Sequence, residues 1–200
     1  MNLENFCNDN FNDPKNVFKM LMEYKKILLN ENHKMNLIGK STIDDFDQRH
    51  IIDCIQIIKH MPDKKKQVMD IGTGAGLPGV LLSILGYQNL HLVEKSPKKS
   101  AFLETCKAHL GLNYRIHTKP IAEISGVNID YITARAFAPI EKIITATKKI
   151  IHTKTIYILL KGKSYLSELN LINPQKYSWQ NYPSITSEES KIIVLGIKWL

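Results

Sequence analysis

The chain has 200 residues, 44% of them hydrophobic and 23% charged, which is the composition of a globular protein that can form a core without disulfides or metals. No apolar run approaches the roughly 18 residues needed to cross a bilayer, no secretory signal opens the chain, and the three cysteines lack metal-binding spacing, so we expect a cytoplasmic protein with free thiols. The formal net charge of +8 permits a nucleic-acid partner, but only three of the 27 basic residues are arginine, and an AT-rich genome produces the same lysine bias.

The N-terminal part of the sequence is predicted to be helical. Residues 14–31 carry an apolar stripe of period 3.6, which predicts a helix. A second helix is expected over residues 41–58, because a capping residue followed by acids precedes a series of isoleucines. A polar, lysine-rich connector then separates an N-terminal helical extension, residues 1–65, from a second domain, residues 66–200.

In the second domain, short apolar runs alternate with helical stretches. The predicted strands are 68–71, 90–94, 114–117, 131–134, 156–160 and 192–197, and the predicted helices are 78–85, 97–110 and 139–151. This alternation predicts an α/β fold of the Rossmann-like type, a mostly parallel, doubly wound sheet with helices on both faces.

A glycine-rich loop follows the first predicted strand, and it is the most specific feature of the sequence. It reads D-I-G-T-G-A-G-L-P-G from Asp70 and places glycines at the alternate positions Gly72, Gly74 and Gly76. Glycines let the backbone turn sharply and approach a ligand where a Cβ would collide. The loop opens onto a helix at the carboxyl edge of the sheet, where open α/β folds bind their ligands.

Two cofactors compete for this loop. A dinucleotide requires G-x-G-x-x-G at the turn, and the stretch that begins at Gly74 satisfies that pattern. That match starts two residues late and leaves Asp70 and Gly72 without a role, whereas D-x-G-x-G-x-G is typical of S-adenosylmethionine-dependent methyltransferases. The pattern favours a methyltransferase. An NAD(P)-dependent oxidoreductase and an RNA-binding module with a vestigial cofactor site remain as alternatives.

Glu94 ends the second predicted strand, 22 residues after Gly72. A carboxylate at this position can accept two hydrogen bonds from the hydroxyls of a ribose. The alternative is a solvated acid at the end of a strand. The register with the glycine loop favours the ribose role.

Several further stretches carry a resemblance to one family. They are Met35–Leu37, Gln48–Asp53, the Gly76–Gly79 extension of the loop, Lys98–Leu103, Ala134–Ala138 and Leu160–Gly162. Together with Asp70 and Glu94 they lie in order over most of the chain. In these motifs the sequence resembles the bacterial 16S ribosomal RNA guanine-N7 methyltransferases, long called glucose-inhibited division protein B.

The resemblance implies a cytoplasmic, non-membrane enzyme that methylates N7 of a guanine in the decoding region of 16S ribosomal RNA, as naked RNA or within the small-subunit particle. It implies S-adenosylmethionine as the cofactor, and we expect a monomer. The expected cofactor-binding residues are Gly72, Gly74, Gly76, Leu77, Glu94, Ala122, Glu123 and Arg135. Because RNA phosphates and guanine edges attract basic side chains, the expected RNA-binding residues are Arg49, His50 and Lys161.

The absence of two other motifs agrees with this substrate. Methyltransferases that act on amino groups carry a Pro-Pro-aromatic element after the fourth strand, where this chain has Ala134–Pro139. Methylation of pyrimidine carbon 5 requires a nucleophilic cysteine, but Cys54 and Cys106 lie within predicted helices. Guanine N7 requires neither element. A methyltransferase acting on another RNA, a protein or a small molecule remains the alternative.

Overall fold

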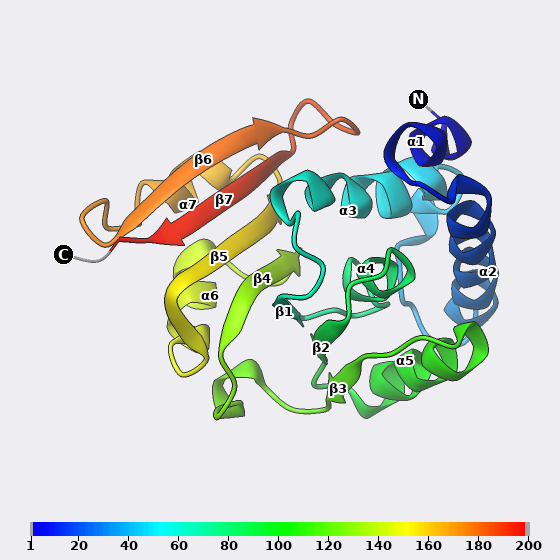
Figure 1. Cartoon of the computed structure of the whole chain (residues 1–200), viewed down its shortest axis with the longest axis horizontal. Helices are drawn as coiled ribbons and strands as arrows, with labels where there is room; N and C mark the ends of the chain where they lie inside the picture. Colours follow the sequence, from blue (N-terminus) through cyan, green and yellow to red (C-terminus); the bar gives the residue numbers. More distant parts are fainter. Residues whose placement is uncertain (1, 199–200) are drawn as a thin grey trace.

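The computed structural model describes residues 2–198 and contains a seven-stranded sheet in the order β3-β2-β1-β4-β5-β7-β6 (Figure 1). The first five strands in the chain are parallel to one another, and β7 runs antiparallel to both of its neighbours, β5 and β6. The strands are β1 (Gln67–Ile71), β2 (Asn89–Val93), β3 (Arg115–His117), β4 (Ile129–Arg135), β5 (Ile151–Lys161), β6 (Tyr177–Pro183) and β7 (Lys191–Ile197). The predicted α/β fold with a mostly parallel sheet is confirmed.

Helices cover both faces of the sheet because successive strand residues point to opposite faces. In β1, Val68 belongs to a buried cluster shared with the N-terminal helices, while its neighbour Met69 belongs to a second buried cluster on the other face. The first face carries α4 (Gly79–Ile84) and α5 (Pro97–Leu110), and the second carries α6 (Ile140–Thr147) and α7 (Tyr165–Leu169).

The N-terminal residues form more helical segments than predicted. The predicted helix 14–31 is confirmed as α2 (Pro14–Asn32), but α1 (Leu3–Asn10) precedes it, capped by the Asn2 side chain. The prediction of one helix over residues 41–58 is wrong. The chain forms a 3-10 turn at Lys40–Thr42 and, separately, a continuous helical segment from residue 47 to residue 60. This segment consists of a π-helical turn (Asp47–Ile52), α3 (Asp53–Ile55) and a 3-10 turn (Gln56–His60).

This N-terminal part packs on the sheet through the same hydrophobic cluster as α4 and α5. Leu21, Tyr24 and Leu28 of α2 are fully buried and belong to that cluster. The proposed division of the chain after residue 65 stays a prediction. Across residues 2–198, no helix combines the length and the apolar character needed to span a membrane.

Four elements of the second half differ from the prediction. The predicted helix 139–151 ends earlier, at Thr147, because the carbonyl of Ile150 already bonds to the amide of Ile129 in β4. The strand expected at 156–160 extends over the whole of β5. Neither β6 nor α7 was predicted, since β6 alternates only between half-buried and exposed residues and α7 is one short turn.

Candidate functional site

The glycine-rich loop connects β1 to α4 and is anchored by Asp70. The Asp70 carboxylate is fully buried and accepts hydrogen bonds from the Thr73 hydroxyl at 2.5 Å, the Gly79 amide at 2.9 Å and the Thr133 hydroxyl at 3.0 Å. Burial raises the pKa of Asp70 to about 6, while these hydrogen bonds act in the opposite direction. A Cβ on Gly79 would lie 2.8 Å from Asp70 Oδ2, so a glycine there leaves room for the carboxylate. Asp70 therefore holds the loop from inside the protein.

The three alternating glycines differ in what a side chain would meet. Gly72, Gly74 and Gly76 have φ angles of 66°, 57° and 90°, where L side chains are strained. A Cβ at Gly72 would lie 2.2 Å from the Phe137 ring, and a Cβ at Gly76 would lie 2.3 Å from Val80. At Gly74, the nearest atom to such a Cβ is the Gly72 carbonyl oxygen, at 3.8 Å. An added Cβ at Gly74 would therefore make only this one ordinary contact, so the position has room from which a ligand can approach.

Glu94 lies directly beside this open position. One oxygen of its carboxylate accepts a hydrogen bond from the Gly74 amide at 3.1 Å, and the other accepts one from the Ser96 amide at 2.8 Å. The residue is only 8% exposed, so it is not a freely solvated acid. Each carboxylate oxygen has a second lone pair, which leaves acceptor capacity for a ligand hydroxyl.

Three further predicted cofactor-binding residues, Leu77, Ala122 and Glu123, differ in burial. Leu77 is buried in the hydrophobic cluster behind the loop. Ala122 and Glu123 are exposed in the 3-10 turn Ile121–Glu123, which follows β3. Because β3 is parallel to β2, this turn lies at the same edge of the sheet as Glu94.

Arg135, at the carboxyl end of β4, is bonded to the N-terminal helical segment. Its guanidinium donates hydrogen bonds to the Arg49 carbonyl oxygen at 3.0 Å and to His50 Nδ1 at 3.1 Å, and it lies 3.7 Å from Asp53 Oδ2. These contacts join residues about 85 positions apart in the sequence. Arg135 thus brings two of the predicted RNA-binding residues to the end of the strand that it occupies.

His50 is buried and has a partner at each ring nitrogen. Because Nδ1 accepts from Arg135, the proton of the neutral ring lies on Nε2, which is 2.7 Å from the Thr42 hydroxyl. Burial, followed by the nearby charges of Arg135 and Arg49, lowers the pKa of His50 to about 4. The ring is therefore neutral at physiological pH.

The other two residues predicted to bind RNA, Lys161 and Arg49, differ in exposure. Lys161, at the end of β5, donates hydrogen bonds to the Ala138 carbonyl oxygen at 2.6 Å and to Glu168 at 2.7 Å, and its side chain is mostly buried. The side chain of Arg49 is exposed. Arg49 is therefore available to a partner molecule, whereas Lys161 already neutralises an internal carboxylate.

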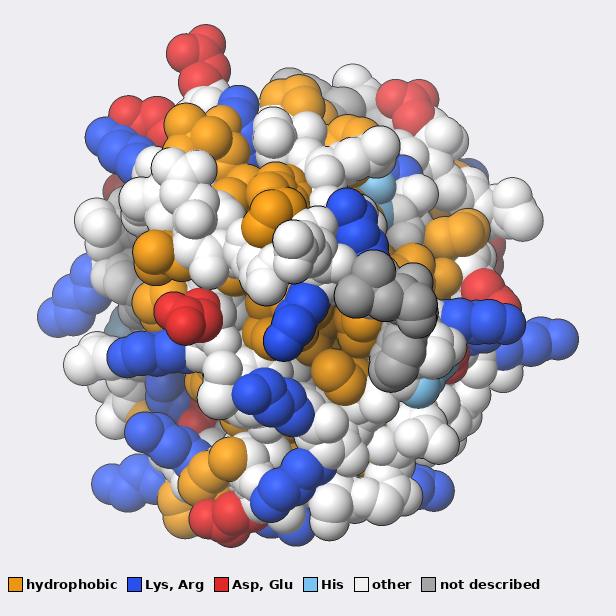
Figure 2. All heavy atoms as spheres, turned by 90° about the vertical axis from the view of Figure 1, so that its left-hand side faces the viewer, with side chains coloured by type: hydrophobic (Ala, Val, Ile, Leu, Met, Phe, Trp, Pro, Cys, Tyr) orange, Lys and Arg blue, Asp and Glu red, His pale blue; other side chains and the backbone are white. Residues whose placement is uncertain are grey.

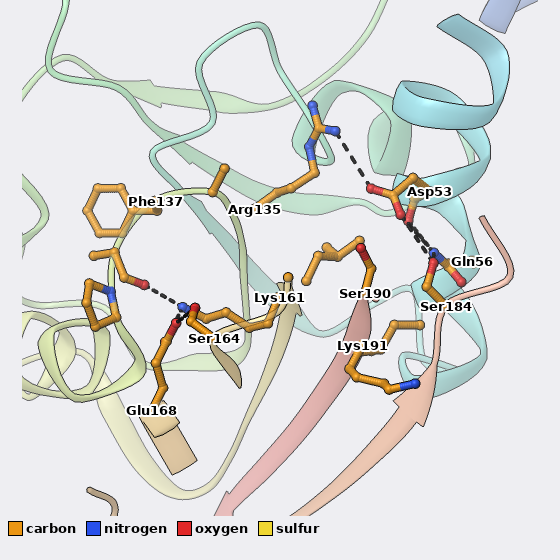
Figure 3. Close-up of a pocket in the computed structure, with 16 residues that line it drawn as sticks. Asp53, Gln56, Arg135, Phe137, Lys161, Ser164, Glu168, Ser184, Ser190 and Lys191 are labelled. Atoms are coloured by element: carbon orange, nitrogen blue, oxygen red, sulfur yellow. Dashed lines mark hydrogen bonds and ion pairs between the residues drawn. The ribbon is translucent and has the colours of Figure 1, made fainter. Parts of the chain in front are cut away.

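Two cavities meet at the carboxyl end of β4. The first, of about 400 Å³, is lined by Phe137 and Lys161 among others (Figure 3). The second, of about 580 Å³, is lined by Arg49 and His50. Within residues 2–198, neither lining includes Gly74 or Glu94. The cavities share four lining residues, Asp53, Arg135, Ala136 and Ser190.

Asp53 and Gln56 attach the segment between β6 and β7 to this site, and neither had been assigned a role from the sequence. The Thr186 hydroxyl donates to Asp53 at 2.8 Å, Gln56 Nε2 donates to the Ser184 hydroxyl at 2.9 Å, and the Ile185 amide donates to Gln56 at 2.9 Å. Asp53 belongs to one of the motifs that carry the family resemblance, and that was its only signal. The partners lie 128 to 133 residues away, so no local pattern could have revealed them.

Basic side chains are spread over one side of the molecule without forming a single patch. Figure 2 shows the face that carries β6 and β7, on which Lys and Arg side chains are spread around an apolar area with acidic side chains between them. A distributed positive charge attracts phosphates over a broad area. The net charge therefore does not by itself indicate a path for RNA on this face.

Comparisons with solved structures identify the fold. A ribosomal protein L11 methylase from Lactobacillus delbrueckii subsp. bulgaricus has a TM-score of 0.63 and 15% identity, over 74% of this chain and 77% of that chain. A magnesium protoporphyrin IX methyltransferase from Synechocystis, solved with bound SAM, has a TM-score of 0.62 and 14% identity, over 88% of this chain and 97% of that chain. The fold is that of S-adenosylmethionine-dependent methyltransferases.

Sequence comparisons are more specific. The GidB family model, described as rRNA small subunit methyltransferase G, matches residues 18–190. A ribosomal RNA small subunit methyltransferase G from Orientia tsutsugamushi is 35% identical over 193 residues, covering 96% of each chain. The corresponding protein of Rickettsia rickettsii is 34% identical over 181 residues, covering 90% of this chain and 94% of its own. The chain therefore belongs to the family of rRNA small subunit methyltransferase G.

Proposed function

We propose that this protein transfers a methyl group from S-adenosylmethionine to N7 of a guanine in 16S ribosomal RNA. Membership of the family supports the reaction and the substrate class. The observation in the structure that carries the proposal is the contact between Glu94 and the Gly74 amide. It places a carboxylate acceptor beside the one glycine of the alternating set where an added Cβ would meet no clash.

The residues around the loop fit S-adenosylmethionine. The open side of Gly74 admits the close approach of a ligand to the backbone, and the free lone pairs of Glu94 suit the two hydroxyls of a ribose. The turn carrying Ala122 and Glu123 would offer its backbone to the adenine edge. When bound, the cofactor supplies an electrophilic methyl group on a positively charged sulfur.

The reaction requires little acid–base chemistry from the protein. Guanine N7 has an in-plane lone pair and carries no proton, so it can attack a methyl group without being deprotonated. The task of the protein is to align N7 with the methyl group in a desolvated site. His50 agrees with this expectation, because its ring is neutral and its Nδ1 lone pair is already used by Arg135.

Arg49 is the proposed RNA contact whose side chain is exposed, at the rim of the 580 Å³ cavity. His50 and Lys161, also proposed as contacts, would have to exchange their partners Thr42 and Glu168 for RNA. Arg49→Ala should raise the KM for ribosomal RNA and reduce the slope of log K against log salt by about one unit. The matched control is Arg115→Ala, which removes an exposed arginine from β3. Equal effects of the two variants would remove Arg49 from the proposal.

The proposal includes a cytoplasmic monomer that acts on the small-subunit RNA or particle. Cys7, Cys54 and Cys106 are all free and buried, which suits a reducing compartment. Sedimentation of the purified protein tests the monomer, and comparison of naked 16S RNA with assembled particles identifies the substrate form.

The decisive experiment maps N7-methylguanosine in small-subunit RNA from cells with and without this protein. Loss of one modified guanine, restored by the wild-type gene but not by a Gly74→Val variant, supports the proposal. An unchanged map with intact S-adenosylhomocysteine binding would point to a methyltransferase with another substrate. Binding of a nicotinamide dinucleotide in its place would point to an oxidoreductase.

A further inference from the structure

The segment that follows β4 lies between the glycine loop and the 400 Å³ cavity. Ala136 has a φ of 51° and is the one non-glycine residue in the left-handed region among residues 2–198. A non-glycine residue in this region is strained and persists when its surroundings hold it there, most often at functional sites. The next residue, Phe137, is therefore presented by a constrained backbone.

Phe137 contacts both parts of the site. Its ring packs against Gly72, where an added Cβ would lie 2.2 Å from Cδ2, and the residue also lines the 400 Å³ cavity. Figure 3 places Phe137 at one end of this cavity, with Asp53 and Gln56 at the other and Lys161 between them.

The Phe137 side chain is also exposed, which is unusual for a large aromatic residue. It is 41% exposed and is the one aromatic residue among the large exposed hydrophobic side chains of residues 2–198. An exposed ring on a strained backbone contributes little to folding, because neither the exposure nor the strain is favourable. The combination is explained if the ring has a partner that is not part of this chain.

We propose that Phe137 is the stacking surface for the substrate nucleobase, which enters the 400 Å³ cavity beside the glycine loop. This inference rests on the proposed function and names the subsite for the guanine. Enzymes that modify a base take it out of the stack and hold it against aromatic or apolar side chains. Cavities of roughly 300–1,000 Å³ accommodate small ligands, and the cavity next to Phe137 falls in this range. The ring replaces the stacking that the base loses when it leaves its neighbours.

Three substitutions separate stacking from packing. Phe137→Leu keeps an apolar side chain but removes the π face, Phe137→Tyr keeps the π face, and Phe137→Ala removes both. Because stacking on an aromatic ring changes affinity by about 5- to 150-fold per base, Phe137→Leu and Phe137→Ala should lower kcat/KM for ribosomal RNA by about 10- to 100-fold. The kcat/KM of Phe137→Tyr for ribosomal RNA should remain within about threefold of the wild-type value. Leu171→Ala, which truncates an apolar residue that is 68% exposed, is the control and should change nothing.

Calorimetric titration with S-adenosylhomocysteine supplies the second measurement, which needs no turnover. The proposal expects Phe137→Leu to bind it like the wild type and to keep the wild-type melting temperature. Wild-type activity of Phe137→Leu would overturn the proposal, as would equal losses in Phe137→Leu and Phe137→Tyr. A fall in S-adenosylhomocysteine affinity that matches the fall in activity would assign the ring to the cofactor site instead. If the wild type itself does not methylate guanine N7, the proposed function fails, and that result is distinct from all of these.

Discussion

The hydroxyl of Tyr24 in α2 donates a hydrogen bond of 2.6 Å to the carbonyl oxygen of Ala75 in the glycine loop, 51 residues later. Tyr24 is fully buried and Ala75 is 4% exposed, so water cannot replace this bond. The loop is therefore held on two sides, by Asp70 from the sheet and by Tyr24 from the N-terminal helix.

Tyr24→Phe should lower both stability and cofactor affinity. It leaves the Ala75 carbonyl buried without a partner, which costs about 1–3 kcal/mol of unfolding free energy. If roughly 1 kcal/mol of this comes from the preorganisation of the loop, S-adenosylhomocysteine affinity falls about 3- to 10-fold. Thermal unfolding and calorimetry measure the two effects.

Tyr114→Phe is the matched control for that substitution. Tyr114 is also buried and donates to a backbone carbonyl, that of Leu103 in α5, at 2.7 Å. We expect a similar loss of stability and no loss of cofactor affinity. Equal affinity losses in both variants would show that Tyr24 acts only through general stability.

Gly74→Val should abolish cofactor binding in a folded protein. The new side chain would occupy the room in front of the loop, where a Cβ meets no clash, and would be strained at a φ of 57°. Gly111→Val carries the same strain, roughly 1–2 kcal/mol, at a φ of 62° with no atom within 4 Å of the added Cβ. Titration with S-adenosylhomocysteine should show no binding to the first variant and wild-type binding to the second. Unchanged affinity of folded Gly74→Val would contradict the assignment of the loop.

Glu94→Ala should weaken cofactor binding by about 1.5–3 kcal/mol, the range for hydrogen bonds to a charged group. The variant loses the acceptor proposed for the ribose and also releases the amides of Gly74 and Ser96. Glu104→Ala, on the exposed side of α5, is the control. An affinity loss below about twofold in Glu94→Ala would exclude the ribose role.

Asp70→Asn should remove a pH dependence of stability. Because burial raises the pKa of Asp70 from 3.8 to about 6, the folded protein keeps this proton where the unfolded chain has lost it. The resulting stability is present below about pH 4 and is lost as the pH rises to about 6, an effect of up to about 3 kcal/mol. An asparagine can still accept from Gly79 and donate to Thr133, so the variant should fold.

Denaturant unfolding between pH 4 and pH 7 tests this prediction. The unfolding free energy of wild type minus that of Asp70→Asn should fall as the pH rises through this interval. The same comparison with Asp44→Asn, at an exposed acid, should be flat. A flat difference for Asp70→Asn would show that the carboxylate stays ionised throughout.

Single-turnover methylation at saturating RNA should be nearly independent of pH from about 6.5 to 8.5, because no general base is required. General bases contribute typically about 10²–10⁴-fold where they act. His50 agrees with this, since its pKa of about 4 keeps it neutral over the whole interval. A first-order rise in rate that disappears on substitution of one Asp, Glu or His would indicate an amino, hydroxyl or protein nucleophile.

Local patterns in the sequence were sufficient for six of the seven strands and for the glycine loop. Short apolar runs that alternate with helical stretches predict strands buried on both faces, because burial determines at which positions apolar residues recur. The glycines from Gly72 to Gly76 are required by backbone conformation, and Glu94 by its register with that loop, so each leaves a short-range signal.

The tertiary structure alone decided which residues meet around the loop. Arg135 finds its partners about 85 residues earlier, Asp53 binds a segment 133 residues later, and Tyr24 reaches the loop from α2. Each of these hydrogen bonds joins two residues that are far apart in the sequence, and it requires no particular residues next to them in the chain. The exposure of Phe137 likewise follows from the turn at Ala136 and its contact with Gly72. Periodic burial produces a pattern of apolar residues that can be recognised in the sequence. A single long-range hydrogen bond produces no such pattern, because its partners meet only once the chain has folded.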